Sequence, residues 1–366
     1  MDDDEELAFI DDLVGDQAGT WDRAGEIPLD RLRRIGARGL LCAETPAGFG
    51  GLGASSGRNG ELTAYAGSRC GSLRSVMTSH GMAAWTVQRL GDREQRRRYL
   101  AQLTSGTLAA VGFSEPAAGS DLSAIKTEIR SQGDSVVING EKMWVTAARY
   151  ADLLLIVGLH GDGAGVVAVP ADAPGVSIER VPDPLGCRAA GHAHIRLDHV
   201  RLPAGAMLGG GGQPLSLVFT AALSYGRLSV AWGCVGIIRA CLNAATRHAR
   251  TREQAGQPIA GHQLIRRHIA DLLVAEQVSS RVCEHASRSW QSLSDDLAIA
   301  AVLAKHVSAG HAAHSAATAV QVLASAGSQD GHVVARAYRD AKMMEIIEGS
   351  NEISQLILAE HALSAD

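Results

Sequence analysis

The feature of this 366-residue chain that most constrains its fold is the separation of two sequence patterns into blocks. In residues 5–106, and again after residue 212, apolar residues recur three and four positions apart, which is typical of amphipathic helices. Residues 109–208 instead contain short β-branched runs separated by turn residues, which is typical of strands. Because helices and strands do not alternate, the sequence predicts an α+β fold rather than a parallel doubly wound sheet.

The chain is also longer than the roughly 250 to 300 residues at which a single hydrophobic core stops growing, so several domains are expected. We place an N-terminal all-α domain at residues 1–108, a central antiparallel β-domain at 109–208 and a C-terminal four-helix bundle at 209–366. The bundle is predicted from four Ala-rich segments near residues 215–250, 262–291, 295–326 and 331–362. Within the β-domain, the adjacent Asn139 and Gly140 predict a type I′ hairpin turn.

Charge and cysteine usage exclude several classes of protein. A formal net charge of −5, without a basic stripe, argues against a nucleic-acid-binding surface. The six cysteines form no CxxC pair and no dense framework, which is typical of a reducing cytoplasm. The start MDDDEELAF lacks the basic region of a signal peptide, and no uninterrupted apolar run reaches the ~18 residues of a membrane span. We therefore expect a soluble, cytoplasmic protein without membrane insertion.

A glycine-rich segment and a group of histidines do not indicate a binding site. The glycine-rich segment GGLGASSG at residues 50–57 neither follows a strand nor opens a βαβ unit, so we interpret it as a loop between helices. His306, His311 and His314 are spaced by five and three residues, which does not place all three on one helix face as a ligand set. We expect no metal site. A GxSxG nucleophile elbow is absent from the sequence.

Two segments of the β-domain are candidates for holding a polar cofactor. AVGFSEPAAGSD, at residues 110–121, offers Ser114, Ser120 and backbone amides among small residues, although an ordinary strand-to-loop turn explains it equally well. In EKMWVT, at residues 141–146, strand alternation would direct Trp144 and Thr146 to one face, giving a stacking ring beside a hydroxyl. The alternative is a tryptophan of the core.

Glu348 is the candidate catalytic base. It lies in IIEGSNE, residues 346–352, between Ile347 and Gly349. Burial would disfavour its charged form and raise its pKa toward that of a base for a weakly acidic carbon. From the local sequence alone, an exposed glutamate within a helix explains the segment as well.

Four motifs in order along nearly the whole chain resemble the acyl-CoA dehydrogenase family: SEPAAGSD at 114–121, WVT at 144–146, DHVRLP at 198–203 and RDAKMMEIIEGSNE at 339–352. The resemblance implies an acyl-CoA dehydrogenase-like fold and FAD-dependent oxidation of the CH–CH bond of an acyl thioester. Glu348 would remove the α-proton while the β-hydride passes to flavin N5. Arg227 matches an arginine near the base, and Gly226 stands where some members place their base.

The resemblance also assigns the remaining site residues. Those implied to hold FAD from the same chain are Val111, Phe113, Ser114, Ser120, Trp144, Thr146, Ser350 and Glu352. Those implied to reach the FAD of a neighbouring subunit are Arg252, Gln263, Gln321 and Ser325, so a homodimer or homotetramer is expected. Those implied to contact the substrate are Ser120, Ser224, Tyr225, Arg227 and Gly349.

The sequence also departs from the family pattern. Ala255 stands where a Phe is usual, Ala324 and Ser325 replace a Gly pair, and Ala189 and Ala190 replace polar residues. The compact, Arg-rich chain is similar to actinomycete members that oxidise acyl carrier protein thioesters for hydroxymalonyl or methoxymalonyl polyketide extender units. The electron acceptor would be an electron-transfer flavoprotein or oxygen. An oxygen-using flavin oxidase or monooxygenase, and a non-catalytic carrier-protein-binding module, are the alternative functions.

Overall fold

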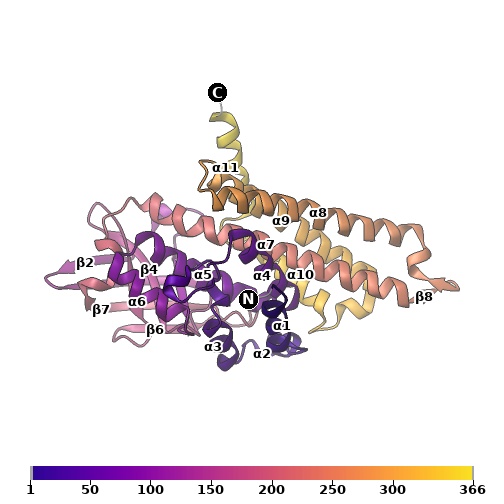
Figure 1. The fold of residues 1–366 in the computed structure, drawn as a ribbon, viewed down its shortest axis with the longest axis horizontal. Helices are drawn as coiled ribbons and strands as arrows, with labels where there is room; N and C mark the ends of the chain where they lie inside the picture. Colours follow the sequence, from indigo (N-terminus) through magenta and orange to yellow (C-terminus); the bar gives the residue numbers. More distant parts are fainter. Residues whose placement is uncertain (1–2, 365–366) are drawn as a thin grey trace.

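The N-terminal part of the chain is helical, as the sequence predicts. The computed structural model describes residues 3–364. Its first helices are α1 (Asp3–Val14), α2 (Ala18–Ala24), α3 (Leu29–Ala37), α4 (Ser56–Arg69), α5 (Gly71–Leu90) and α6 (Arg93–Leu103) (Figure 1). The glycine-rich segment between α3 and α4 is a loop with two short 3-10 turns, at Leu40–Cys42 and Ala47–Phe49. Helix α6 begins at a capping box in which Asp92 and Gln95 each bond the other's backbone N–H.

The middle of the chain forms one seven-stranded sheet. Its strands are β1 (Ala109–Gly112), β2 (Glu128–Gln132), β3 (Ser135–Val145), β4 (Leu153–His160), β5 (Gly163–Pro170), β6 (Val176–Arg180) and β7 (Ala193–Pro203). The strand order is β1-β4-β2-β3-β7-β6, with β5 also paired to β4. The predicted β-domain is confirmed, and most neighbouring strands are antiparallel. The exceptions are β1 and β2, which both run parallel to β4.

The hairpin predicted at Asn139 and Gly140 is wrong. The turn between β2 and β3 is formed by Gly133 and Asp134, since Gln132 pairs with Ser135. Asn139 and Gly140 instead lie inside β3, at a shift of its register against β7. A Cβ on Gly140 would lie 2.8 Å from Cα of Thr127. The glycine therefore serves a close approach of two backbones rather than a turn.

The C-terminal part is a helical bundle, but its fourth predicted helix is broken. The helices are α7 (Leu215–Thr251), α8 (Gln263–Gln291), α9 (Leu297–Leu323), α10 (Val333–Met344) and α11 (Asn351–Ser364). Between α7 and α8 a small hairpin contains β8 (Glu253–Gln254) and β9 (Gln257–Pro258). The expected helix at 331–362 is interrupted at residues 345–350, and α11 projects away from the bundle (Figure 1). The interruption contains Glu348.

Helix α7 is the central element of the molecule. Its most apolar 18-residue window has a mean hydropathy of 1.5, enough by length and composition for a membrane span, but 72% of that window is buried inside the protein. It packs against α4 and α5 of the N-terminal region and against α8, α9 and α10 of the bundle. These contacts identify α7 as the core helix of a soluble protein.

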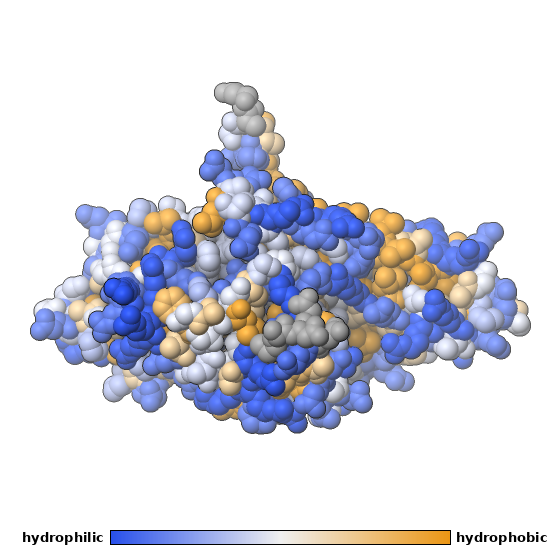
Figure 2. Space-filling view, in the orientation of Figure 1, coloured by the Kyte–Doolittle hydropathy of each residue, from blue (hydrophilic) through white to orange (hydrophobic). Residues whose placement is uncertain are grey.

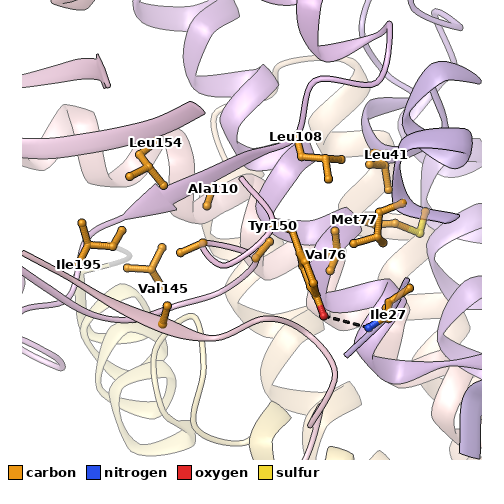
Figure 3. Packing of buried hydrophobic residues seen from close by; sticks show 14 of the residues in the cluster. Ile27, Leu41, Val76, Met77, Leu108, Ala110, Val145, Tyr150, Leu154 and Ile195 are labelled. Carbon is orange, nitrogen blue, oxygen red and sulfur yellow. Dashed lines mark hydrogen bonds between the residues drawn. The ribbon is translucent and has the colours of Figure 1, made fainter. Parts of the chain in front are cut away.

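A second region of packing joins the N-terminal helices to the sheet. Tyr150 lies between them and accepts a hydrogen bond from N–H of Ile27 (2.9 Å) (Figure 3). Its hydroxyl also donates to the carbonyl of Ala189 (2.9 Å). Leu108 and Val145 pack into the same cluster. Because Leu108 directly precedes β1 and Val145 ends β3, this cluster positions the two strands that carry the cofactor-site motifs.

Candidate active site

Glu348 lies in a turn that two cations hold in place. Arg227 Nε donates to the carbonyl of Glu348 (3.1 Å), and Lys305 Nζ donates to the carbonyl of Gly349 (2.6 Å). The backbone φ of Glu348 is 55°, a left-handed conformation that is unfavourable for a residue with a side chain. The contacts with α7 and α9 therefore break the helical pattern of IIEGSNE and direct Glu348 inward.

The carboxylate of Glu348 is shielded and unpartnered. The residue as a whole is half-buried, but its Oε2 is inaccessible to solvent and has no hydrogen-bond partner. Burial raises the pKa of Glu348 to about 7, against the opposing charges of Arg227, Lys305 and Arg74. A carboxylate with this pKa and a free oxygen can accept a proton near neutral pH.

Gly226 provides the space for this carboxylate. A Cβ at this position would collide with Oε2 of Glu348 and lie 2.7 Å from its Cδ. The glycine on α7 is thus required by the base on the 345–350 turn. The neighbouring Ser224 is also buried, and its Oγ has no hydrogen-bond partner.

The loop after β1 is fixed by a buried ion pair that the sequence analysis missed. Glu115 accepts from Lys142 Nζ (2.7 Å) and from the backbone N–H groups of Lys126 (2.5 Å) and Thr127 (3.0 Å). Lys142 Nζ also donates to the carbonyl of Phe113 (3.1 Å). Burial alone would raise the pKa of Glu115, but these hydrogen bonds outweigh it and lower the pKa. The only sequence signal is that Lys142 is one of four lysines in the chain.

Trp144 and Thr146 do come together, though not by simple strand alternation. Trp144 has a φ of 56° at a register shift between β3 and β7, and β3 ends at Val145 before Thr146. The Trp144 side chain is not part of the core, since 49% of the residue is exposed. The alternative of a core tryptophan is wrong.

His192 joins these two residues and was not among the predicted site residues. Its Nδ1 lies 3.3 Å from Thr146 Oγ1, and its ring centroid lies 6.1 Å from that of Trp144. His192 is buried, its Nε2 has no hydrogen-bond partner, and burial lowers its pKa to about 4, so the ring is neutral at pH 7. The repeated histidine in HAH at residues 192–194 was the available signal.

The surroundings of Trp144 fit a flat ring with polar edges. The exposed indole offers a stacking surface, the Thr146 hydroxyl a donor, and the unpartnered Nε2 of His192 a further polar atom. Val111 is buried at the end of β1, Phe113 packs against Phe219 at 5.8 Å, Ser114 is half-buried and Ser120 is exposed. A Cβ on Gly119 would meet nothing within 4 Å, so this loop is open to a ligand.

Of the remaining predicted residues, two lie next to the turn that carries Glu348 and one does not. Ser350 directly precedes α11, and its Oγ accepts from N–H of Ile353 (3.4 Å), while Glu352 lies in the first turn of α11 and is exposed. Tyr225 is different. Its hydroxyl accepts from Asn59 Nδ2 (3.2 Å), and its ring packs with Trp85 and Trp290. The structure therefore places the Tyr225 side chain in an aromatic cluster rather than with Glu348.

The four residues expected to reach a neighbouring subunit lie at the opposite end of the molecule from the sheet. Arg252, Gln263, Gln321 and Ser325 are all exposed. Thr251, Leu323 and Ala326 line one cavity of about 500 Å³, so the ends of α7 and α9 are adjacent. Figure 1 shows β8, next to Arg252, at one end of the long axis and the sheet at the other. A single chain does not bring these four residues to Trp144.

Within residues 3–364 no group of three or more His, Cys, Asp or Glu residues could hold a metal ion. His311, from the histidine group weighed above, has its Nδ1 3.0 Å from Ser279 Oγ. This contact is an ordinary hydrogen bond between α8 and α9.

Comparisons with known proteins agree over the whole length. Models of the N-terminal, middle and C-terminal domains of acyl-CoA dehydrogenases match residues 4–107, 110–200 and 216–363. The probable acyl-CoA dehydrogenase YngJ of Bacillus subtilis (strain 168) is 33% identical over 364 residues, covering 97% of this chain and 95% of that protein. The human mitochondrial short-chain specific acyl-CoA dehydrogenase is 28% identical over 359 residues, covering 94% and 85%.

Among solved structures, FkbI, described as serving biosynthesis of the methoxymalonyl extender unit of the polyketide Fk520, superimposes with a TM-score of 0.95. It is 61% identical in sequence, and the match covers 99% of this chain and 100% of that one.

Proposed function

Because this chain belongs to the acyl-CoA dehydrogenase family and is an oxidoreductase acting on CH–CH bonds, we propose that Glu348 is the base of its reaction. The observation that carries the proposal is the shielded, unpartnered Oε2 of Glu348 beside Gly226. A buried carboxylate already engaged by donors would be a weak base. This one is held by its backbone instead, so its oxygen remains available for the α-proton of an acyl thioester.

The family uses FAD, and we assign its site in this chain to the strand ends of the β-domain. Trp144 and Thr146 would flank the ring, and Val111, Phe113, Ser114 and Ser120 would follow its edge and pyrophosphate. When bound, FAD supplies the acceptor for the hydride. The Glu115–Lys142 pair supports this assignment because it holds the Ser114 loop against β3. The role of Thr146 is to present a hydroxyl in an orientation set by His192.

The substrate we propose is a thioester of an acyl carrier protein in the formation of a polyketide extender unit. The support is FkbI, with 61% identity over 99% of this chain, which is described as acting in methoxymalonyl biosynthesis. The replacement of polar residues by the buried Ala189 and Ala190 is consistent with a thioester end handled differently from that of CoA enzymes. An electron-transfer flavoprotein or oxygen would reoxidise the enzyme.

We also propose that two or four copies assemble, so that one chain completes the cofactor site of another. Arg252, Gln263, Gln321 and Ser325 are exposed, and they lie far from the Trp144 of their own chain. Helix α8 carries exposed apolar residues at Leu264, Leu273, Val274 and Val278. Figure 2 shows apolar residues gathered over this part of the bundle. A cytoplasmic location is consistent with six free, buried cysteines.

The experiment that tests the proposal is anaerobic mixing of purified protein with candidate acyl thioesters, followed by flavin absorbance. The wild-type protein should be yellow and should bleach, whereas Glu348→Gln should keep its flavin and lose bleaching. Glu360→Gln, an exposed glutamate on α11, is the matched control. Bleaching of Glu348→Gln at the wild-type rate would show that the base is elsewhere. Peroxide formed without an added acceptor would identify an oxidase.

A further inference from the structure

His192, which directly precedes β7, has one ring nitrogen engaged and the other free. Its Nδ1 lies 3.3 Å from Thr146 Oγ1, whereas its Nε2 is buried and has no hydrogen-bond partner among residues 3–364. Because burial lowers its pKa to about 4, the ring is neutral at pH 7 and carries one hydrogen, on either nitrogen. The Thr146 hydroxyl therefore either accepts a hydrogen bond from His192 or donates its own hydrogen to it.

The backbone on each side of this contact is fixed. The carbonyl of Thr146 accepts from Ser79 Oγ on α5 (2.9 Å), and the carbonyl of His192 accepts from N–H of Val181 (3.0 Å). Within residues 3–364, His192 Nδ1 is the hydrogen-bond partner that the Thr146 hydroxyl has. The direction of the hydroxyl hydrogen is therefore decided by the imidazole and by any ligand that reaches the hydroxyl.

His194, two residues later, makes a contact of a different kind. Its Nδ1 accepts from the backbone N–H of Trp144 (3.3 Å), and since a backbone N–H can only donate, this nitrogen carries no hydrogen. Because β3 and β7 are antiparallel, each histidine of HAH lies beside one of the two residues that we assign to the flavin ring. His194 contacts a backbone group, but His192 contacts a hydroxyl and can change what that hydroxyl offers to a ligand.

The flavin nitrogen that receives the hydride changes its hydrogen-bonding character on reduction. It is an acceptor in the oxidised ring and an N–H donor in the reduced ring. A Thr146 hydroxyl that accepts from Nδ1–H keeps its own hydrogen for the ring, and that hydrogen would lose its acceptor when the ring is reduced. A hydroxyl that donates to Nδ1 offers the ring only lone pairs. The position of the imidazole hydrogen therefore decides which redox state of the flavin the hydroxyl favours.

We propose that His192 carries its hydrogen on Nδ1, directs the hydrogen of the Thr146 hydroxyl towards this ring nitrogen, and so lowers the reduction potential of the bound flavin. The inference rests on the proposed function and deepens it, because it names a positioning residue that acts on the cofactor through Thr146. With the hydrogen on Nε2 instead, a buried N–H would have no acceptor within residues 3–364, and such groups are rare in folded proteins. With the hydrogen on Nδ1, the imidazole donates in the contact that the fold provides.

The test measures the midpoint potential of the flavin-loaded protein by equilibration with a redox dye, which requires neither substrate nor turnover. His192→Gln moves the side-chain N–H outward to the reach of Nε2, and so removes the donor from Thr146. We expect its potential to rise by about 15 to 30 mV, a roughly three- to tenfold change in the relative affinities for oxidised and reduced flavin. His192→Asn, whose amide nitrogen lies one bond beyond Cγ as Nδ1 does, should restore most of the wild-type value. His199→Asn on β7, where 82% of the side chain is exposed, is the control and should leave the potential unchanged.

Thr146→Val shows whether His192 acts through the hydroxyl. Alone, it should raise the potential by a similar amount, because it removes the hydrogen that the oxidised ring accepts. Adding His192→Gln to Thr146→Val should then change nothing further. A structural role of His192 would instead add a shift of its own in the double variant.

An unchanged potential in His192→Gln, or a shift that persists in the Thr146→Val background, would overturn the proposal. A lower potential in His192→Gln would overturn it too, since it would mean that the hydroxyl donates to His192. Should His192→Gln lose its flavin, the rise in Thr146→Val and the absence of one in His192→Asn decide the matter. Failure of the proposed function looks different. Flavin-loaded protein that no acyl thioester bleaches would remove the reaction and leave the order of these potentials as it is.

Discussion

Two buried carboxylates of this protein lie near cations, yet their surroundings shift their pKa values in opposite directions. Glu115, in the β-domain, accepts hydrogen bonds from Lys142 and two backbone amides, and its pKa is lowered. Glu348, between α10 and α11, has Arg227 and Lys305 nearby, but both donate to backbone carbonyls, and its pKa is raised to about 7. Hydrogen bonds to the carboxylate, rather than nearby positive charge, distinguish a structural anion from a base.

Glu348→Gln should produce the largest effect, because it removes the only function that the unpartnered oxygen serves. We expect flavin reduction by the thioester substrate to slow by about 10²- to 10⁴-fold, as for loss of a general base. Stopped-flow absorbance under anaerobic conditions measures this rate. A rate within twofold of the Glu360→Gln control would show that Glu348 is not the base.

Lys142→Met tests the structural role of the ion pair between Glu115 and Lys142. Removing one partner of a buried pair leaves Glu115 uncompensated, which typically costs about 3–5 kcal/mol of unfolding free energy. Denaturant unfolding checks this, with flavin content as a second measurement because the Ser114 loop would loosen. Lys126→Met, with an exposed side chain, should change stability by less than about 0.5 kcal/mol. Equal stability of the two variants would mean that the pair contributes nothing to the loop.

Gly226→Ala sharpens the comparison by moving the base without changing its charge. The added Cβ would displace the Glu348 carboxyl, which lies 2.7 Å away at its Cδ. A displacement of about 1 Å in a reacting group costs on the order of 10²-fold in rate. Gly310→Ala on α9, whose Cβ would meet nothing within 4 Å, is the control. Full activity of Gly226→Ala would show that Oε2 does not need its present position.

The pH dependence of stability should also separate the two carboxylates. For Glu348 the folded-state pKa of about 7 lies above the ordinary 4.5, so the folded state binds the extra proton between these values. Stability attributable to Glu348 is therefore fully present below pH 4.5 and lost as pH rises through 7, by about 3 kcal/mol in total. Glu348→Gln should remove this slope. Glu115, with a lowered pKa, contributes in the opposite direction, losing stability only in acid.

Much of the fold could be predicted from the sequence because it follows from local patterns of apolar, β-branched and turn residues. Helices α7, α8 and α9 begin and end within a few residues of the expected bounds, and the β block was located correctly. The break in the fourth helix was not predicted. IIEGSNE continues an apolar helical pattern, and the break is stabilised by hydrogen bonds from Arg227 and Lys305, which are distant in the sequence. The turn predicted at Asn139 and Gly140 was wrong for a similar reason, because close packing of Gly140 against Thr127 overrides the local turn signal.

In the candidate site, too, residues within local motifs could be predicted, whereas residues that depend on distant contacts could not. Glu348, Trp144 and Thr146 could be proposed from motifs, although the left-handed backbone of Trp144 could not. His192 and Lys142 were missed because their significance lies in contacts with residues 46 and 27 positions away in the chain. A buried ionisable side chain shows in the sequence only as a residue type, whereas its partners, or their absence, appear only in the fold.

The most direct test of the central claim is the pH dependence of the flavin reduction rate with a saturating thioester between pH 5 and 9. An unpartnered Glu348 with a pKa near 7 predicts a rate that rises through an apparent pKa of about 7 and then levels off. Glu348→Gln should lose that rise. A wild-type rate that is already constant at pH 5, with its break near the ordinary carboxyl value, would show that Glu348 is solvated and would contradict the account.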